Sequence, residues 1–292
     1  MRTFRVQHRT RYAYDRDVTF GPHHLMIRPR DSHDMRVLDS SLSVSPEADV
    51  HWAYDTFGNS VAILTFHRAA AELIILSGLR LRRYGYDEPV SRLSRYAGPY
   101  PFRYDTEEAF DLAPYLSLLF PRDRSMVKQW IAKAIPDLPA GSLQVLDLLG
   151  DAVHSGFRYS RREEYGVQSP GTTIRTASGT CRDFALLYME AARILGFAAR
   201  FVTGYLYDPG SDAPDATTVS GAGATHAWAD VFVPGAGWVE FDPTNRIVAG
   251  RNLIRVGTTR SPAQAVPVSG TYHHDGGKFL GMQVEVSVTR DE

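Results

Sequence analysis

The sequence predicts an α+β fold, with an N-terminal antiparallel β-sandwich-like domain over residues 1–100 and a mixed core over residues 101–292. Two features of the apolar pattern lead to this prediction. Up to about residue 100, apolar side chains recur at every second position, as they do in half-buried strands. Beyond that point they first follow the spacing of helices and then alternate again. The length of 292 residues also suits about two domains.

The first domain is predicted from a series of short alternating runs. In FRVQHRTRYAYD, the side chains of Phe4, Val6 and Tyr12 alternate with more polar neighbours. Further runs follow in HHLMIRPR, RVLDSSLSVSP, VHWAYDTFGNSVAILTF and AELIILSGLRLRRY. Residues 57–59, Phe-Gly-Asn, predict a hairpin turn because glycine and asparagine tolerate positive φ angles. The turn residues of YAGPYPFRYD then predict a linker.

The core is predicted to contain helices followed by three strands. Apolar residues have helical spacing in SMVKQWIAKAI, SLQVLDLLGDAVHSGF and CRDFALLYMEAARILGF. Ser125 and Ser142 are the predicted N-caps of the first two helices, and Gly196 is the predicted stop of the third. The strands are AARFVTGYLYD, THAWADVFVP and GWVEFDPTN, with a loop over residues 208–224 between the first two. MQVEVSV predicts a β tail at the end of the core.

Composition limits the classes of partner and the cell compartment that we expect for the protein. The net charge is −1, with 32 Lys+Arg against 33 Asp+Glu, which favours neither nucleic acid nor an anionic membrane as a partner. The single cysteine cannot form an intramolecular disulfide, which fits a reducing compartment. The N-terminus lacks the apolar segment of a secretory signal, and no apolar run approaches the roughly 20 residues that span a bilayer. We therefore expect a soluble cytoplasmic protein.

Cys181 is the first candidate for chemistry. It opens a predicted helix within S-G-T-C-R-D-F-A, where unpaired backbone N–H groups and the helix dipole favour negative charge. Both effects favour the thiolate, which is the nucleophilic form of cysteine. Gly179, two residues earlier, allows the tight turn and the close substrate approach that an exposed nucleophile needs.

His226 and Asp242 are candidate partners of this thiol. His226 lies in T-H-A-W-A-D-V and Asp242 lies in G-W-V-E-F-D-P, on successive predicted strands. The pKa of histidine suits proton transfer near neutral pH, and a carboxylate beside it can fix its tautomer. Their separation, 242 − 226 = 16 residues, suits two antiparallel strands joined by the VPGAG turn. We therefore predict a catalytic triad of Cys181, His226 and Asp242.

Each of these residues also has an ordinary structural interpretation. A lone cysteine is more often a small buried hydrophobic residue than a nucleophile. A histidine in a strand is usually structural, and an aspartate before proline is usually a turn residue. The order of the three motifs, with a glycine before the cysteine and two tryptophan-bearing strands after it, favours the catalytic interpretation.

Two long segments resemble a known family. GTCRDFALLYMEAARILGFAARFVTGYL and THAWADVFVPGAGWVEFDPTN are similar to the core of the bacterial transglutaminase-like superfamily. HRTRYAYDRDVTFGPHHLMIRPR and YDTFGNSVAILTF are similar to the β domain that precedes this core in one bacterial branch. The resemblance implies a papain-like architecture, in which a helix bearing the cysteine packs on an antiparallel sheet bearing the histidine and the aspartate.

The resemblance also implies roles for the site residues. Cys181 becomes the nucleophile, His226 the general acid and base, and Asp242 the orienting residue, with thioester chemistry on an amide carbonyl. The Cys181 backbone N–H is a natural first donor to the oxyanion. In the family the second donor is an upstream side chain, often tryptophan, whereas here only Trp130 lies between the linker and Cys181. By their chemistry, Tyr159 and Gln168 are candidates for the second donor.

The predicted function is therefore hydrolysis of amide, peptide or isopeptide bonds in a peptide or protein substrate. Amine transfer to glutamine, as in a transglutaminase, is the alternative within the enzyme class, and a non-catalytic peptide-binding module is the alternative outside it. No cofactor or nucleotide is expected, because neither a Walker motif nor GxGxxG occurs. No metal is expected either, since HExxH is absent and His273-His274-Asp275 resembles an exposed turn. The oligomeric state is not predicted.

Overall fold

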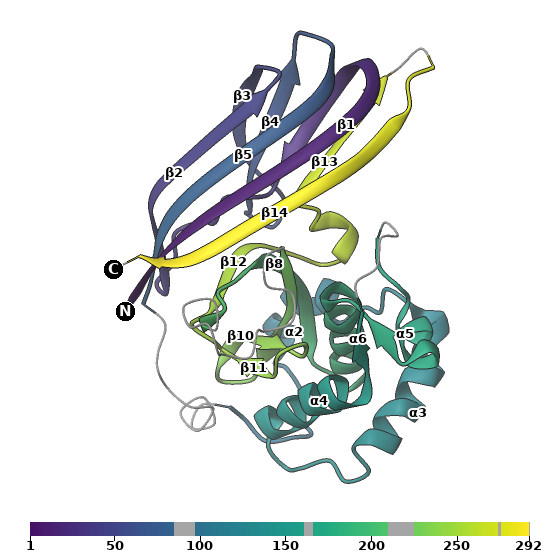
Figure 1. The fold of residues 1–292 in the computed structure, drawn as a ribbon. Helices are drawn as coiled ribbons and strands as arrows, with labels where there is room; N and C mark the ends of the chain where they lie inside the picture. The colour runs from purple at the N-terminus through teal and green to yellow at the C-terminus, as the bar shows by residue number, and fades with distance from the viewer. Residues whose placement is uncertain (85–96, 161–165, 210–224, 274–275, 292) are drawn as a thin grey trace.

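The computed structural model describes residues 1–84, 97–160, 166–209, 225–273 and 276–291, and it has the predicted α+β fold. An all-β unit lies beside a mixed unit in which helices cover a smaller sheet (Figure 1). The predicted loop over residues 208–224 lies almost wholly outside the described residues, as do His274 and Asp275. Among the described residues, no helix combines the length and the apolar character needed to cross a membrane.

The first unit is built around one long strand, β1, which takes part in two layers. The strand order is β2-β5-β1-β4-β3, and β13 and β14 also pair with β1. Phe20, Leu64 and Leu73 are buried between the layers, with the alternating apolar pattern predicted from the sequence. The strands are β1 (Arg2–Leu25), β2 (Met35–Ser45), β3 (Ala48–Tyr54), β4 (Ser60–Phe66), β5 (Ala70–Arg83), β13 (Val268–His273) and β14 (Phe279–Asp291).

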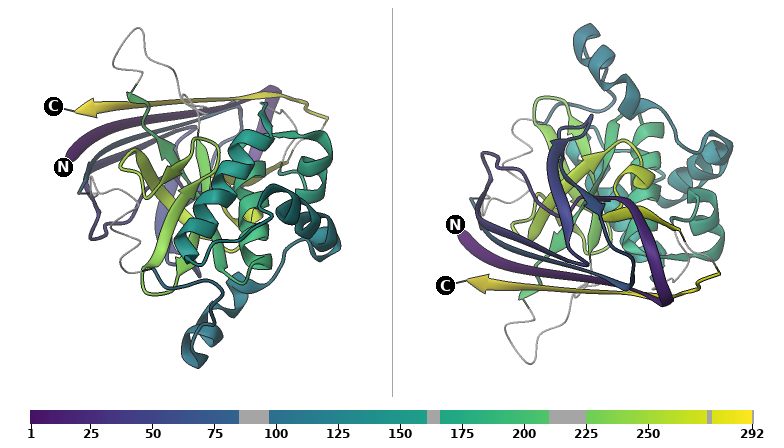
Figure 2. Two further views of the ribbon diagram at one scale, coloured as in Figure 1. Left: turned by 90° about the horizontal axis from the view of Figure 1, so that it is seen from below. Right: turned by 90° about the horizontal axis from the view of Figure 1, so that it is seen from above.

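The C-terminal strands do not extend the second unit as expected. β14 pairs with β1 from Thr3↔Asp291 to Tyr14↔Phe279, and β13 pairs with the second half of β1. As a result the two chain termini lie side by side (Figure 2). Alternation shows that a segment has one apolar face, but it does not say which sheet buries that face. Here Val286 of β14 packs with Phe4 and Val6 of β1.

In the second unit, helices pack on a five-stranded antiparallel sheet of order β11-β10-β9-β8-β12. A short two-stranded parallel sheet, β6-β7, precedes helix α6. The helices are α2 (Thr106–Leu116), α3 (Arg124–Ala134), α4 (Ser142–Gly156), α5 (Pro170–Thr176) and α6 (Cys181–Ile194), with 3-10 turns at η1 (Pro121–Asp123) and η3 (Pro262–Gln264). The strands are β6 (Arg158–Tyr159), β7 (Ser178–Gly179), β8 (Ala198–Leu206), β9 (His226–Val233), β10 (Gly237–Asp242), β11 (Ile247–Val248) and β12 (Leu253–Thr259).

The core of this unit is the layer between α6 and strands β8–β10. Phe184, Leu187 and Tyr188 of α6 are almost completely buried there. The helix ends as predicted, because Gly196 has a φ of +95° just beyond its C-cap. The predicted N-cap Ser142 is instead the first residue of α4, and Asp123 rather than Ser125 stands at the N-cap position of α3.

The two units share an apolar cluster and a group of ion pairs. Tyr205 of β8 and Ile254 of β12 are buried against Phe4 and Leu81 of the first unit. Beside them, the Arg83 guanidinium lies 2.6 Å from the Asp34 carboxylate and 3.5 Å from that of Glu240 in β10. These charges are nearly buried, so their pairing avoids the large cost of an isolated buried charge. The second unit therefore packs firmly on the first.

Candidate active site

The candidate nucleophile is the first residue of α6. The preceding Thr180 caps the helix: its hydroxyl accepts from the Asp183 N–H, and the Asp183 carboxylate accepts from the Thr180 N–H at 2.9 Å. Cys181 is 6% exposed, and its backbone N–H has no acceptor in the described part of the chain. A Cβ on Gly179 would lie 2.9 Å from the Asp183 Cβ, so the tight turn before Cys181 requires glycine.

Asp183 organises this turn from a fully buried position. Besides Thr180, its carboxylate accepts from the Gln168 backbone N–H at 2.7 Å and from the Gln168 side-chain amide at 3.2 Å. The same amide donates to the Ser178 carbonyl at 3.1 Å. Both side-chain N–H groups of Gln168 are thus occupied within the turn, and Gln168 fits a role in anchoring it better than the predicted role of oxyanion donor.

Tyr159 lies beside the same turn. It is opposite Gly179 in the β6-β7 ladder, and its ring centroid is 6.4 Å from that of Phe184 in α6. The neighbouring Ser160 N–H donates to the Gly179 carbonyl at 2.9 Å. Tyr159 is therefore near the start of α6, and its assignment as the second oxyanion donor stays a prediction.

His226 opens β9 and lies opposite Gly204 of β8. The imidazole is 1% exposed, and its Nε2–H donates to the Asp242 Oδ2 at 2.8 Å. The other ring nitrogen, Nδ1, has no hydrogen-bond partner among the described residues. Two of the three predicted triad residues are therefore in direct contact, and Nδ1 is the nitrogen left for a third.

Asp242 ends β10 and is held by the turn that follows it. Its Oδ1 accepts from the Thr244 N–H at 3.0 Å, and its Oδ2 accepts from the Asn245 side-chain amide at 2.9 Å. His154 of α4 bonds to the Thr244 carbonyl at 2.9 Å and so fixes the turn from outside. Sequence reasoning missed Asn245, although a carboxamide three residues after a candidate carboxylate was a usable signal.

The charges at the site favour a protonated imidazole. Burial alone lowers the pKa of His226, but the Asp242 carboxylate, through charge and hydrogen bonding, and the nearby Cys181 side chain raise it to about 10. Burial alone raises the pKa of Asp242. The positive charge of His226 and the hydrogen bonds from His226, Asn245 and Thr244 outweigh burial, so the pKa of Asp242 is lowered overall. The pair is thus an imidazolium and a carboxylate at neutral pH.

The matches to family models agree with this geometry. Residues 4–82 match the bacterial transglutaminase-like N-terminal region, and residues 132–243 match the transglutaminase-like superfamily. The chain belongs to the transglutaminase-like superfamily. The second match contains Cys181, His226 and Asp242 and runs from α3 to just beyond β10.

Relatives of this transglutaminase-like chain extend over nearly its whole length. An uncharacterized protein of Mycobacterium tuberculosis is 29% identical over 308 residues, covering 97% of this chain and 92% of the relative. One of Mycobacterium leprae is 26% identical over 290 residues, covering 97% and 98%. The crystal structure of a candidate cysteine protease from Cytophaga hutchinsonii superposes with a TM-score of 0.73 at 18% identity, covering 100% of this chain and 92% of that one. The two-unit fold therefore recurs in that protein.

The tryptophans of the two strands that carry His226 and Asp242 lie in different surroundings. Trp228 is fully buried in a small cluster with Val202 and Leu253, with its ring centroid 6.0 Å from that of His226. Trp238 packs edge-on against Tyr115 and Phe232. No group of three or more His, Cys, Asp or Glu residues in the described ranges is arranged to hold a metal ion.

Proposed function

We propose that the protein is a cysteine hydrolase that cleaves amide, peptide or isopeptide bonds in peptide or protein substrates through a thioester. One observation supports this most strongly. The buried imidazole of His226 commits Nε2 to Asp242 and leaves Nδ1 without a partner, while the Cys181 side chain is near enough to raise its pKa. Most buried polar nitrogens are paired, because an unpaired one costs stability, so an Nδ1 held free beside a thiol supports proton transfer between the two.

In the first half of the proposed reaction, the Cys181 sulfur attacks the carbonyl carbon of the amide. The negative charge on the carbonyl oxygen is stabilised by the Cys181 N–H at the N-terminus of α6. His226 gives its Nδ1 proton to the departing nitrogen, the C–N bond breaks, and an amine and a thioester are formed. Asp242 keeps the ring in the orientation that points Nδ1 at the reacting atoms.

In the second half, water replaces the amine. His226, now neutral, takes a proton from the water as its oxygen attacks the thioester carbon. The C–S bond breaks, the acid leaves, and the thiolate and imidazolium are restored. Hydrolysis is preferred over amine transfer because water is always present, whereas transfer needs a second site that binds an amine and excludes water.

The test is to incubate the protein with a glutamine-containing peptide and a labelled primary amine. We expect ammonia or a new amine terminus, lost at least 10³-fold in Cys181→Ala and in His226→Ala. His51→Ala, which changes an exposed histidine of β3, is the matched control and should retain full activity. Incorporation of the amine would contradict hydrolysis and establish transfer, and no Cys181-dependent product at all would favour the binding module.

A cytoplasmic location belongs to the same proposal. A thiol that must stay reduced suits that compartment, and the chain has a single cysteine. Fractionation of cells that produce the protein from its own gene tests this, because recovery outside the cytoplasmic fraction would contradict it.

A further inference from the structure

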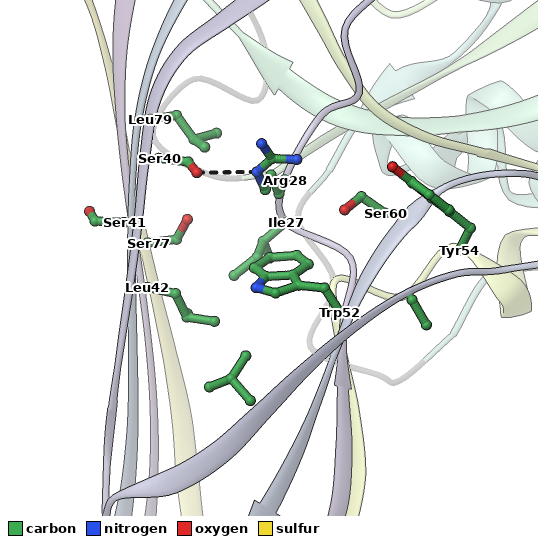
Figure 3. Close-up of a pocket in the computed structure, with 12 residues that line it drawn as sticks. Ile27, Arg28, Ser40, Ser41, Leu42, Trp52, Tyr54, Ser60, Ser77 and Leu79 are labelled. Carbon is green, nitrogen blue, oxygen red and sulfur yellow. Dashed lines mark hydrogen bonds between the residues drawn. The ribbon is translucent and has the colours of Figure 1, made fainter.

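The first unit contains a groove whose lining includes none of Cys181, His226 and Asp242. It has a volume of about 570 Å³ and opens between strands β2 and β3 (Figure 3). We call it the β2–β3 groove. Its apolar lining includes Ile27, Leu42, Leu79 and Trp52, and Ser40 and Ser77 add hydroxyl groups. This mixture of apolar surface and a few polar groups is typical of a binding site.

Large apolar side chains of β3 are exposed at the mouth of the groove. Trp52 is 42% exposed and Val50 is 43% exposed, although both are large and apolar. Among the described residues, Arg28 is the one charged residue of the lining. Its Nε donates to the Ser40 hydroxyl at 3.1 Å, and its guanidinium carbon is 5.8 Å from the centre of the Trp52 ring. This part of the groove therefore combines a rigid aromatic surface with a positive charge.

Both strands at the rim have a free edge among the described residues. β2 pairs only with β5, and β3 pairs only with β4. β3 contains neither proline nor lysine, and its alternation directs Val50, Trp52 and Tyr54 to the side of the groove. An unprotected edge of this kind is a template for another strand, and proteins usually block such edges unless they use them.

A second cavity of about 350 Å³ lies on the other face of the β3–β4 layer. Its lining from β4 is Val61 and Ile63, which alternate with Ser60 of the groove, and it extends to Ala263 and Gln264 of η3. The β2–β3 groove is therefore a separate surface, on the face of this layer that is turned away from η3.

We propose that the β2–β3 groove binds an extended segment of the polypeptide substrate, remote from the bond that is cleaved. The segment pairs with the free edge of β3 as an added strand, and its alternate side chains enter the groove against Trp52 and Leu42. Because Arg28 is the only charge that the described residues bring to the lining, acidic and uncharged segments bind better than basic ones. Calling the bound polypeptide a substrate rests on the proposed function, whereas the binding itself does not.

The test measures binding to the Cys181→Ala protein, so that turnover plays no part. The probe is fluorescently labelled α-lactalbumin, reduced and carboxymethylated so that it is an unfolded acidic polypeptide. We expect Trp52→Ala in this background to raise the Kd at least 10-fold. Phe110→Ala removes another exposed aromatic side chain, 82% exposed on α2 and outside the groove, and should leave the Kd unchanged.

A second probe tests whether the groove prefers acidic to basic segments. Reduced, carboxamidomethylated lysozyme is unfolded and basic, and we expect it to bind at least 10-fold more weakly than the acidic probe, with Arg28→Gln removing most of that difference. Equal Kd values for the parent and Trp52→Ala proteins would overturn the proposal, even if the enzyme hydrolyses amides. Conversely, Trp52-dependent binding by a protein that hydrolyses nothing would support the groove and remove the proposed function.

Discussion

At the scale of single residues, the state of His226 is decided by two opposing effects. Removing an imidazolium from water is unfavourable, and in a site with no other charges it would make the ring neutral. The Asp242 carboxylate, 2.8 Å from Nε2, reverses this and raises the pKa of His226 to about 10. The site therefore keeps a proton at Nδ1, where the proposed reaction needs it, over the whole physiological pH range.

This raised pKa predicts how stability depends on pH. The pKa of His226 is 6.5 in the unfolded chain and about 10 in the folded one, so the folded state binds the proton more tightly. Its contribution to the free energy of unfolding is complete below pH 6.5 and is lost as the pH rises to 10. We expect the wild type to lose a few kcal/mol more than His226→Gln between pH 6.5 and pH 10 in urea titrations.

The contribution of Asp242 to the free energy of unfolding depends on pH in the opposite direction. The pKa of Asp242 is lowered, so its contribution is present above its usual value and disappears on acidification below it. If the free energy of unfolding changed with pH in the same way in the wild type and in His226→Gln, the imidazole and the carboxylate would not form an ion pair in solution.

The three residues of the predicted triad could be proposed from the sequence because each lies in a short motif with a clear chemical purpose. The sequence could not identify their supports. Asn245 and Gln168 act through contacts with Asp242 and Asp183 that depend on how turns fold in space. The second oxyanion donor stays a prediction for the same reason, since such a donor is defined by distance rather than by sequence.

At the scale of elements, the first turn of α6 depends on one buried carboxylate. Asp183 accepts from two backbone N–H groups, those of Thr180 and Gln168, and from the Gln168 side-chain amide. In the sequence, Asp183 is only a carboxylate two residues after Cys181, in the first turn of the predicted helix, where the helix dipole favours negative charge. The Asp183 carboxylate is buried because the loop that carries Gln168, 15 residues earlier in the chain, packs against the start of α6.

Removing this carboxylate should loosen the turn that presents Cys181. Asp183→Ala removes the acceptor of three N–H groups in a part-buried turn, at a cost of roughly 2–4 kcal/mol. We expect urea titrations to give a free energy of unfolding lower by that amount, and an activity loss that is not recovered at lower temperature. Thr180→Ser, which retains the capping hydroxyl, is the control and should change the free energy of unfolding by less than about 0.5 kcal/mol. An Asp183→Ala protein as stable as this control would contradict the assignment.

At the scale of the whole molecule, the chain closes on itself. β14 returns to pair with β1, and Val286 enters the cluster that also holds Tyr205 and Ile254 of the second unit. The change of apolar period near residue 100 predicted two kinds of unit. The partner of the last strand was not predicted, because pairing between the two ends of a chain leaves no local pattern.

This closure predicts that both units unfold together. Val286→Asp places a carboxylate in the shared cluster and should cost about 3–5 kcal/mol, lowering the Tm by roughly 10 °C at about 3 °C per kcal/mol. Glu285→Ala, on the opposite face of β14, is the control and should have little effect. Calorimetry should show one transition that moves as a whole. Two transitions, of which only one moves, would mean that the units are independent.

The central claim, that Cys181 and His226 work as a pair, is tested most directly by alkylation with iodoacetamide. The chain has one cysteine, so the rate refers to Cys181 alone. From pH 9 to pH 6 we expect the rate to fall less than about 10-fold in the wild type, and roughly 200-fold in His226→Ala, as for a free thiol with a pKa of about 8.5. His51→Ala should match the wild type. A 200-fold fall in the wild type, unchanged by His226→Ala, would make Cys181 a structural residue and contradict the proposed enzyme.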